Sequence, residues 1–251
     1  MFYQISCAIR SAIHMLWMLI TVVPYALAIL VASPFASKKV LYTIAAAWLS
    51  NVVHSLRFLC GVRWTISGME NMPQEHEAPV ILVKHQSTLE TFLMPAILPR
   101  QLAYVYKKEL NYVPFFGWAI AQLDMVHINR SLRSRAFQKV VQEGTRIMHS
   151  GVSVIMFPEG TRIPRGQAGS YKTGGTRLAT SAGSKIIPIA VSSAKCWPRK
   201  GFIKYPGLVQ VSIGPVIESQ GRPADELMAQ VEAWIEGEMH RLDPEAYAQK
   251  S

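Results

Sequence analysis

Acidic residues and cysteines are scarce in this chain of 251 residues. Asp and Glu number 16 against 26 Lys and Arg, and the three cysteines, Cys7, Cys60 and Cys196, are widely spaced with no C-x-x-C pattern. Thiols so few and so dispersed predict neither a disulfide framework nor a zinc site, and they are typical of a reducing compartment. The seven histidines form no H-E-x-x-H motif, so we expect no bound metal.

The signatures of several enzyme classes are also missing. The chain has no G-x-S-x-G nucleophile elbow, no G-x-G-x-x-G loop and no P-loop. An S-x-x-K pattern occurs at Ser192–Lys195, but so short a match arises easily by chance and its companion motifs are absent. The sequence therefore argues against a serine hydrolase and against an enzyme that binds nucleotides through these loops.

Charged residues are absent from a long stretch near the N-terminus. Ser11–Ser37 contains no Asp, Glu, Lys or Arg, and a helix needs roughly 20 residues to cross a bilayer core. A secretory signal peptide is the alternative, but the stretch is longer than the usual apolar core of such signals and lacks a small-residue cleavage site before Lys38 and Lys39. A second uncharged stretch, Val40–Leu56, is shorter and more polar, so it is a poor spanning segment.

Basic residues flank both stretches, with Arg10 before the first and Lys38 and Lys39 between them. If both segments crossed as a hairpin, the lysines would lie outside, against the preference of basic residues for the cytoplasmic side. A helical pair that dips into one leaflet keeps them on one side, so we favour this monotopic arrangement over a single span. The net charge of +10 suits an anionic membrane or nucleic acid. Because the apolar residues are concentrated at one end, we expect the membrane bilayer as partner and no nucleic acid.

From about Trp64 the chain alternates between short apolar segments and helical patterns. We expect strands at Val80–Val83, Ala103–Tyr106, Met125–Ile128, Val152–Phe157, Ile186–Val191 and Leu208–Ile213. Amphipathic helices are predicted from about Leu132 to His149 and from Ala224 to Leu242. The alternation predicts a mixed α/β fold, a largely buried sheet flanked by helices, with functional groups at strand ends. We divide the chain into a membrane-anchoring helical segment, 1–60, and an α/β catalytic domain, 61–251.

A histidine and an acid follow the most clearly buried strand. His85 comes two residues after Val80–Val83, and Glu90 follows five positions later. If residues 85 to 90 were all helical, the two side chains would lie roughly 140° apart. They meet only if His85 lies in the turn before a helix and Glu90 in its first turns. An imidazole, whose unperturbed pKa is about 6.5, then suits a general base whose tautomer the carboxylate holds.

Three basic residues, Lys107, Arg130 and Arg162, lie just beyond strand-like segments. Each alone would usually be a solvated surface charge, but an α/β sheet gathers its ligand contacts at strand ends. Arginine offers a planar fork to phosphate and lysine a point charge, so these residues are candidate ligand contacts at the strand ends. The nearby aromatic residues either border a lipid entrance or pack in the core; they are Phe115, Phe116 and Trp118.

The order of these motifs resembles that of the glycerolipid acyltransferases. Over roughly Val80–Val191 the chain has a histidine followed after four residues by an acid, an arginine at a strand end, the sequence FPEGTR and an apolar strand with Pro188. The resemblance is closest to members that acylate 1-acylglycerol 3-phosphate, and the uncharged N-terminal segments are similar to the membrane-binding helix pair of bacterial members. It implies an enzyme of phospholipid biosynthesis at the inner (cytoplasmic) membrane, with its catalytic domain facing the cytoplasm.

The resemblance also implies direct acyl transfer without an acyl-enzyme. His85, oriented by Glu90, would take the proton from the 2-hydroxyl of 1-acylglycerol 3-phosphate (lysophosphatidic acid). The oxygen would attack the thioester of acyl-CoA or acyl-carrier protein and give phosphatidic acid, and no cofactor beyond this co-substrate is implied. The residues expected to bind the acceptor are Lys107, Arg130 and Arg162 at the phosphate, Glu159 at the glycerol, and Gly160 and Thr161 beside it.

Two positions depart from the family pattern, which usually has Asp in place of Glu90 and commonly Asn in place of Lys84. Glutamate is only one methylene longer, and unrelated hydrolases use either acid in this role, so we interpret Glu90 as a functional substitute. Two alternatives stay open: an acyltransferase with another acceptor (glycerol 3-phosphate, another lysophospholipid or an amino-lipid), and a catalytically inactive membrane lipid-binding protein. A pure binder would not need His85 and FPEGTR, and the retained basic residues favour a phosphate-bearing acceptor.

Overall fold

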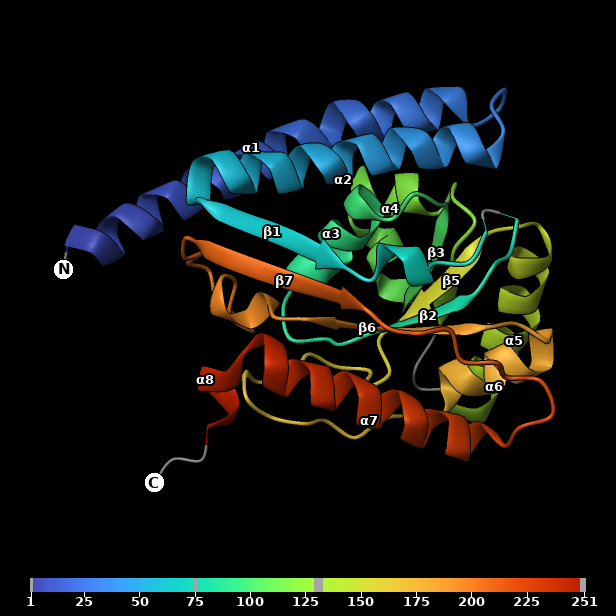
Figure 1. Ribbon diagram of the computed structural model, residues 1–251. Helices are drawn as coiled ribbons and strands as arrows, with labels where there is room; N and C mark the ends of the chain where they lie inside the picture. The colour runs from blue at the N-terminus through green and yellow to red at the C-terminus, as the bar shows by residue number, and fades with distance from the viewer. Residues whose placement is uncertain (1, 75, 129–132, 249–251) are drawn as a thin grey trace.

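The described residues of the computed structural model, 2–74, 76–128 and 133–248, form one seven-stranded sheet with helices on both faces (Figure 1). Arg130, one of the predicted phosphate ligands, lies outside the described residues. The arrangement confirms the predicted mixed α/β fold.

The N-terminal segment folds into a hairpin of two long helices, α1 (Phe2–Ala32) and α2 (Lys38–Cys60), which run side by side over one face of the molecule (Figure 1). Ser37 is the N-cap residue of α2, and its side chain accepts a backbone N–H of the first turn. Gly61 ends α2 in the left-handed conformation, with φ 68°, which suits a residue without a Cβ. Both uncharged stretches are therefore helical.

The sheet has the strand order β1-β7-β6-β2-β5-β3-β4 and is parallel except between β6 and β7. Its strands are β1 (Val62–Ser67), β2 (Val80–Val83), β3 (Leu102–Lys107), β4 (Val126–Ile128), β5 (Ser153–Met156), β6 (Ile186–Val191) and β7 (Gly207–Ile213). Six of them were predicted to within one residue at each end. The seventh, β1, was missed because it is an edge strand with mostly exposed side chains, so no apolar segment marks it.

Helices cover both faces of the sheet (Figure 1). One layer comprises α5 (Arg133–His149), α6 (Gly174–Ala182), α7 (Ala224–Leu242) and α8 (Pro244–Tyr247). The other comprises α3 (Leu89–Ile97), α4 (Phe116–Ile120) and the hairpin. Short 3₁₀ helices lie in the connections: η1 (Met69–Asn71), η2 (Lys108–Tyr112) and η4 (Ser193–Lys195). The two predicted amphipathic helices are present as α5 and α7, whereas α6, which begins with two glycines, was not predicted.

Strand β2 sends its side chains alternately to the two faces of the sheet. Leu82 joins the core beneath α5, α6 and α7, whereas Val83 joins the core beneath α2 and α3. The same alternation, continued past the end of the strand, directs Lys84 toward α7 and His85 toward α3. The turn after β2 thus contributes side chains to the helical layers on both faces of the sheet.

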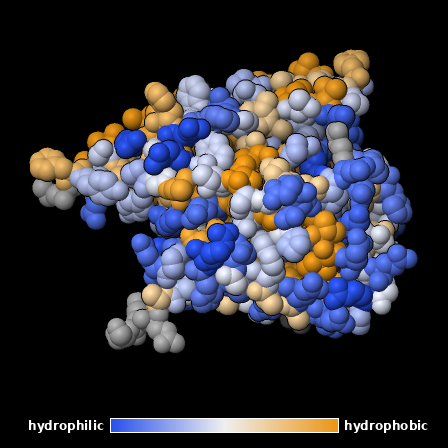
Figure 2. Space-filling view, in the orientation of Figure 1, coloured by the Kyte–Doolittle hydropathy of each residue, from blue (hydrophilic) through white to orange (hydrophobic). Residues whose placement is uncertain are grey.

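Helix α1 presents an apolar surface. Among the described residues it is the one helix long and apolar enough to cross a bilayer, and 11% of its most apolar stretch is buried. Leu16, Leu19 and Ile20 are each more than half exposed, and Figure 2 shows hydrophobic residues gathered along this edge of the molecule. The buried core helix of a soluble protein would not have such a surface.

Helix α2 differs from α1 because part of it belongs to the core of the sheet. Val53, Leu56 and Cys60 are at most 1% exposed and pack in the same cluster as Val83. The predicted division of the chain at residue 60 stays a prediction.

Candidate active site

The turn between β2 and α3 is built around the buried carboxylate of Glu90. Its Oε1 accepts the backbone N–H groups of Gln86 at 3.1 Å and Ser87 at 2.9 Å, and its Oε2 accepts that of Ser87 at 3.0 Å. Ser193, in η4, donates a short hydrogen bond from its hydroxyl to Oε1. A carboxylate in the first turn of a helix is also favoured by the helix dipole. Glu90 therefore shapes the turn that carries His85.

His85 lies against this carboxylate. Its Nδ1 is 3.3 Å from Oε2 of Glu90, within ion-pair distance but without the alignment of a hydrogen bond. The imidazole stacks on Phe157, with ring centroids 3.8 Å apart and planes 15° apart. The side chain is 14% exposed. Because Nδ1 faces Glu90, Nε2 is the ring nitrogen left to meet a substrate; the catalytic role of the pair stays a prediction.

Glu159 is buried beneath the same turn, and 3% of its surface is exposed. Its Oε1 accepts the backbone N–H of His85 at 3.3 Å and lies 3.2 Å from Nζ of Lys84. Burial raises the pKa of Glu159, whereas the neighbouring Lys84 ammonium and the N–H of His85 lower it. These contacts favour a role in holding His85, and the predicted contact of Glu159 with glycerol stays untested.

The rest of the FPEGTR sequence folds against the turn. Nη1 of Arg162 donates to Oγ1 of Thr88 at 2.5 Å, and the N–H of Ile163 donates to the carbonyl of His85 at 2.8 Å. Gly160 has φ 66°, a conformation that glycine adopts without strain, and Thr161 is exposed. A guanidinium group is thereby tied to the turn that carries the imidazole.

Lys107 is the exposed last residue of β3. Tyr104 pairs with Ile155 of β5, and Leu82 of β2 pairs with Met156. Extending both registers places Lys107 level with the residues just after β2 and β5. Lys107 therefore lies at the same ends of the strands as His85. Lys107 makes none of the contacts described above, so its role as a phosphate ligand stays a prediction, as does that of Arg130.

The three aromatic residues considered for a lipid entrance have different surroundings. Trp118 is 48% exposed, whereas Phe115 is half-buried against the cluster between the hairpin and α4. The ring of Phe116 lies 6.2 Å from that of Trp48 in α2. Only Trp118 of the three has the exposure expected beside a lipid surface.

Several contributors to the site were missed from the sequence. Ser193 belongs to the S-x-x-K pattern that was interpreted as chance, and Phe157 was counted only as the end of a predicted strand and the start of FPEGTR. Lys84 pairs with Glu236 of α7, 152 positions away in the chain. A lysine directly after four buried residues, and an acid beside the buried stripe of α7, were the available signals.

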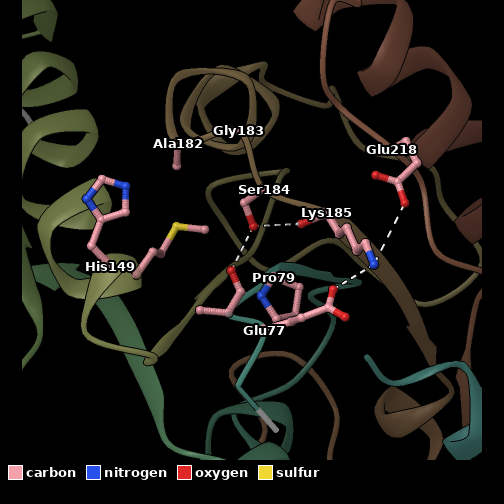
Figure 3. A pocket seen from close by; sticks show the side chains of 10 residues that line it. Glu77, Pro79, His149, Ala182, Gly183, Ser184, Lys185 and Glu218 are labelled. Carbon is pink, nitrogen blue, oxygen red and sulfur yellow. Dashed lines mark hydrogen bonds and ion pairs between the residues drawn. The ribbon is translucent and has the colours of Figure 1, made fainter. Parts of the chain in front are cut away.

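A cavity of about 250 Å³ lies at the opposite ends of the strands, before β2 and β6 begin (Figure 3). Its lining includes Pro79, just before β2, and Lys185, just before β6. Lys185 pairs with Glu77 at 2.6 Å, and the hydroxyl of Ser184 donates to the carbonyl of Ala78 at 2.7 Å. Because Pro79 precedes β2 and His85 follows the other end of that strand, this cavity is separate from the candidate active site.

The arrangement at the end of β2 supplies an oriented imidazole and a nearby guanidinium. Within the described residues there is no group of three or more His, Cys, Asp or Glu suited to hold a metal ion. An imidazole beside a carboxylate and a guanidinium are the groups that a general base and an anion-binding site need. These roles stay predictions.

Comparisons with known proteins agree on one family. The family model described as Acyltransferase matches residues 63–192. A 1-acyl-sn-glycerol-3-phosphate acyltransferase from Pseudomonas aeruginosa is 43% identical over 202 residues, which cover 79% of this chain and 75% of that protein. The 1-acyl-sn-glycerol-3-phosphate acyltransferase alpha of Mus musculus is 29% identical over 69% of this chain and 61% of its own.

A solved structure shares the fold. The crystal structure of the 1-acyl-sn-glycerophosphate (LPA) acyltransferase PlsC from Thermotoga maritima matches with a TM-score of 0.78. The match covers 95% of this chain and 98% of that one, at 20% sequence identity. The N-terminal hairpin is therefore part of the shared architecture.

Proposed function

Because this chain belongs to the acyltransferase family, we propose that it transfers a fatty acyl group from a thioester to the 2-hydroxyl of 1-acylglycerol 3-phosphate, giving phosphatidic acid. The observation that carries the proposal is the pairing of His85 with Glu90, with Arg162 tied to the same turn through Thr88. The relative from Pseudomonas aeruginosa is named for this reaction.

His85 acts as the general base. Its Nε2 takes the proton of the acceptor hydroxyl while the oxygen attacks the thioester carbonyl, and Glu90 stabilises the imidazolium from the other side of the ring. The tetrahedral intermediate then collapses, the C–S bond breaks, and the departing thiolate takes the proton from His85. The products are an ester and a free thiol, and no acyl-enzyme forms.

Arg162 binds the phosphate of the acceptor, with Lys107 and Arg130 as further candidates. A phosphate beside Arg162 lies close to Thr88 and hence to the turn that carries His85. Binding of the phosphate at Arg162 thus also places the acceptor hydroxyl near the base.

An acceptor panel tests the proposed function. Purified full-length protein is assayed with lysophosphatidic acid, glycerol 3-phosphate and lysophosphatidylcholine, each with acyl-CoA and with acyl-carrier protein. We expect the highest kcat/KM with lysophosphatidic acid, and the donor arm decides between the two thioesters. A higher value with another acceptor would replace the proposed substrate, and no transfer to any acceptor would favour the catalytically inactive lipid-binding protein.

Arg162→Ala is expected to weaken use of the acceptor more than use of the donor. A charge-assisted contact contributes about 1.5–3 kcal/mol, so kcat/KM for lysophosphatidic acid should fall by about tenfold or more. The measurement is steady-state kinetics with each substrate varied in turn. Arg130→Ala should act in the same direction if it is the second phosphate ligand.

Arg162→Lys separates charge from geometry, because lysine cannot offer a bidentate fork. Incomplete rescue is expected. If only the KM for the donor rose in Arg162→Ala, the arginine would belong to the CoA or carrier-protein site.

We also propose that α1 anchors the enzyme in the cytoplasmic leaflet of the inner membrane, with the catalytic domain facing the cytoplasm. The exposed apolar surface of α1 supports this, and burying it in lipid contributes about 25 cal/mol per Å². The acceptor is itself a membrane lipid, so an anchored enzyme need not extract it into water. A monotopic hairpin, which keeps Arg10 and Lys39 on one side, is the proposed topology.

Replacing Leu16, Leu19 and Ile20 together with asparagine is expected to release much of the protein from membranes. These side chains are exposed, so the fold should persist while the apolar contact is lost. Fractionation of membranes gives the readout, and high salt alone should not release the wild type, whereas detergent should. Val216→Asn, at an exposed apolar residue far along the chain, is the control and should stay bound.

Topology is tested in sealed vesicles with the separate variants Tyr3→Cys and Lys39→Cys. The three natural cysteines are buried, so the introduced cysteine should be the one that is labelled. Labelling of both from the same side supports the monotopic hairpin. Labelling from opposite sides would establish a single span instead.

A further inference from the structure

Lys84 is fully buried although its side chain is charged. Its Nζ lies 2.5 Å from Oε1 of Glu236 and 3.2 Å from Oε1 of Glu159, and it donates to the carbonyl of Gln167 at 3.3 Å. Moving a charge out of water is costly, so a buried lysine persists only where partners surround it. Here the partners come from two segments that are far from Lys84 in the sequence, residues 159–167 and α7.

Two carboxylates share this one ammonium group. The hydroxyl of Tyr171 donates a further hydrogen bond to Oε1 of Glu236 at 2.7 Å. The second oxygens of Glu159 and Glu236 are buried without a hydrogen-bond partner among the described residues. Lys84 is therefore the counter-ion on which both carboxylates depend.

This cluster lies directly behind the candidate base. The Oε1 of Glu159 that meets Lys84 also accepts the backbone N–H of His85. Gln167 and Tyr171 belong to the segment that follows Arg162. The cluster thus connects the end of β2, the FPEGTR segment and α7.

We propose that Lys84 and Glu236 are positioning residues of the acyl-transfer site: their buried ion pair holds Glu159, and Glu159 fixes the backbone of His85. This inference rests on the proposed function. Because the side chains of Lys84 and Glu236 are 0% and 15% exposed, neither is placed to bind the substrate. Their effect therefore falls on the rate at which bound acceptor reacts. A lysine suits the position because its long side chain spans from the end of β2 to Glu236 of α7.

Protonation of Glu159 provides a second readout. Burial raises the pKa of Glu159, and Lys84 lowers it. The titratable or charged groups that face Glu159 are Lys84, His85, Tyr171, Glu236 and Tyr247. Removing the charge of Lys84 raises this pKa further, so Glu159 stays protonated to higher pH and the acid side of the activity profile moves upward in pH.

The test compares Lys84→Met, Lys84→Arg, Glu236→Gln and the double variant Lys84→Met/Glu236→Gln with wild type, in the full-length protein. Lys84→Met should lower kcat with lysophosphatidic acid roughly tenfold or more, with little change in KM, and shift the pH profile upward. Lys84→Arg should keep more activity because the charge remains. Glu236→Gln should lose less, and the double variant should be no worse than Lys84→Met, because one of the two unpaired carboxylates is gone.

A matched control is Lys185→Met, which removes a lysine paired with Glu77 at 2.6 Å at the opposite ends of the strands. Its kcat and pH profile should equal those of wild type. If Lys84→Met does not fold, kcat and the pH profile of Lys84→Arg and Glu236→Gln are compared with those of wild type instead. Wild-type kcat and pH profile in Lys84→Met, or a loss confined to KM, would overturn the proposal.

Failure of the proposed function is distinguishable from failure of this inference. If wild type itself transfers no acyl group to lysophosphatidic acid, the proposed function is wrong and the kinetic comparison of the variants cannot be made. Thermal unfolding of Lys84→Met, Glu236→Gln and the double variant still tests the pair without substrate. Non-additive changes in Tm are expected for coupled residues, and additive changes would overturn the pairing.

Discussion

Replacing His85 with alanine is expected to abolish acyl transfer while leaving the fold intact. A positioned general base contributes about 10²- to 10⁴-fold to the rate, and the alanine variant lacks the imidazole that is proposed to take the proton. The imidazole stacks on Phe157 at the surface of the core instead of filling it, so stability should change little. The measurement is kcat with lysophosphatidic acid, accompanied by Tm and membrane fractionation.

His149→Ala is the matched control, because His149 is an exposed histidine at the opposite ends of the strands. It should keep wild-type kcat. Near wild-type turnover in His85→Ala, with the same protein folded and membrane-bound, would remove the general base from the mechanism.

Glu90→Gln is expected to lose most of the activity, roughly a hundredfold or more, because a neutral amide cannot stabilise the imidazolium. The change also affects the turn: the carboxylate accepts N–H groups from Gln86 and Ser87, and an amide nitrogen at either oxygen position would face them as a second donor. Glu90→Asp keeps the charge and should retain measurable activity. Both are measured as kcat alongside Tm.

Ser193→Ala helps to separate the two effects of Glu90. It removes the hydroxyl that donates to Oε1 but leaves the carboxylate facing His85, so its loss of kcat should be smaller than that of Glu90→Gln. Equal activity of Glu90→Gln and wild type would show that Glu90 does not assist His85.

Much of the fold could be predicted because its interior strands are apolar and short. Strands β2 and β6 lie in the middle of the sheet and are buried throughout, so their sequences mark them. Strand β1 escaped because an edge strand needs little apolar surface. Helix α6 escaped because Gly174 and Gly175 favour loops in isolation, whereas here Gly175 meets the side chain of Leu82 so closely that a Cβ would clash.

The proximity of His85 and Glu90 was more predictable than the contacts that support their turn. His85 and Glu90 are five positions apart, so a single local turn can bring them together. Lys84 and Glu236 are far apart in sequence, and only the packing of α7 against the sheet makes them neighbours. Glu159 was predicted at the glycerol because the resemblance implied it; its buried carboxylate lies beside Lys84, and the contact with glycerol stays a prediction.

The most direct test of the central claim follows the acyl group itself. Wild type and His85→Ala are given labelled acyl thioester and lysophosphatidic acid in vesicles, and the labelled lipid is identified with the position of its new acyl chain. Wild type should produce phosphatidic acid labelled at the 2-hydroxyl, and His85→Ala should produce at most about a hundredth of it. No labelled phosphatidic acid from wild type, or equal amounts from both proteins, would contradict the account.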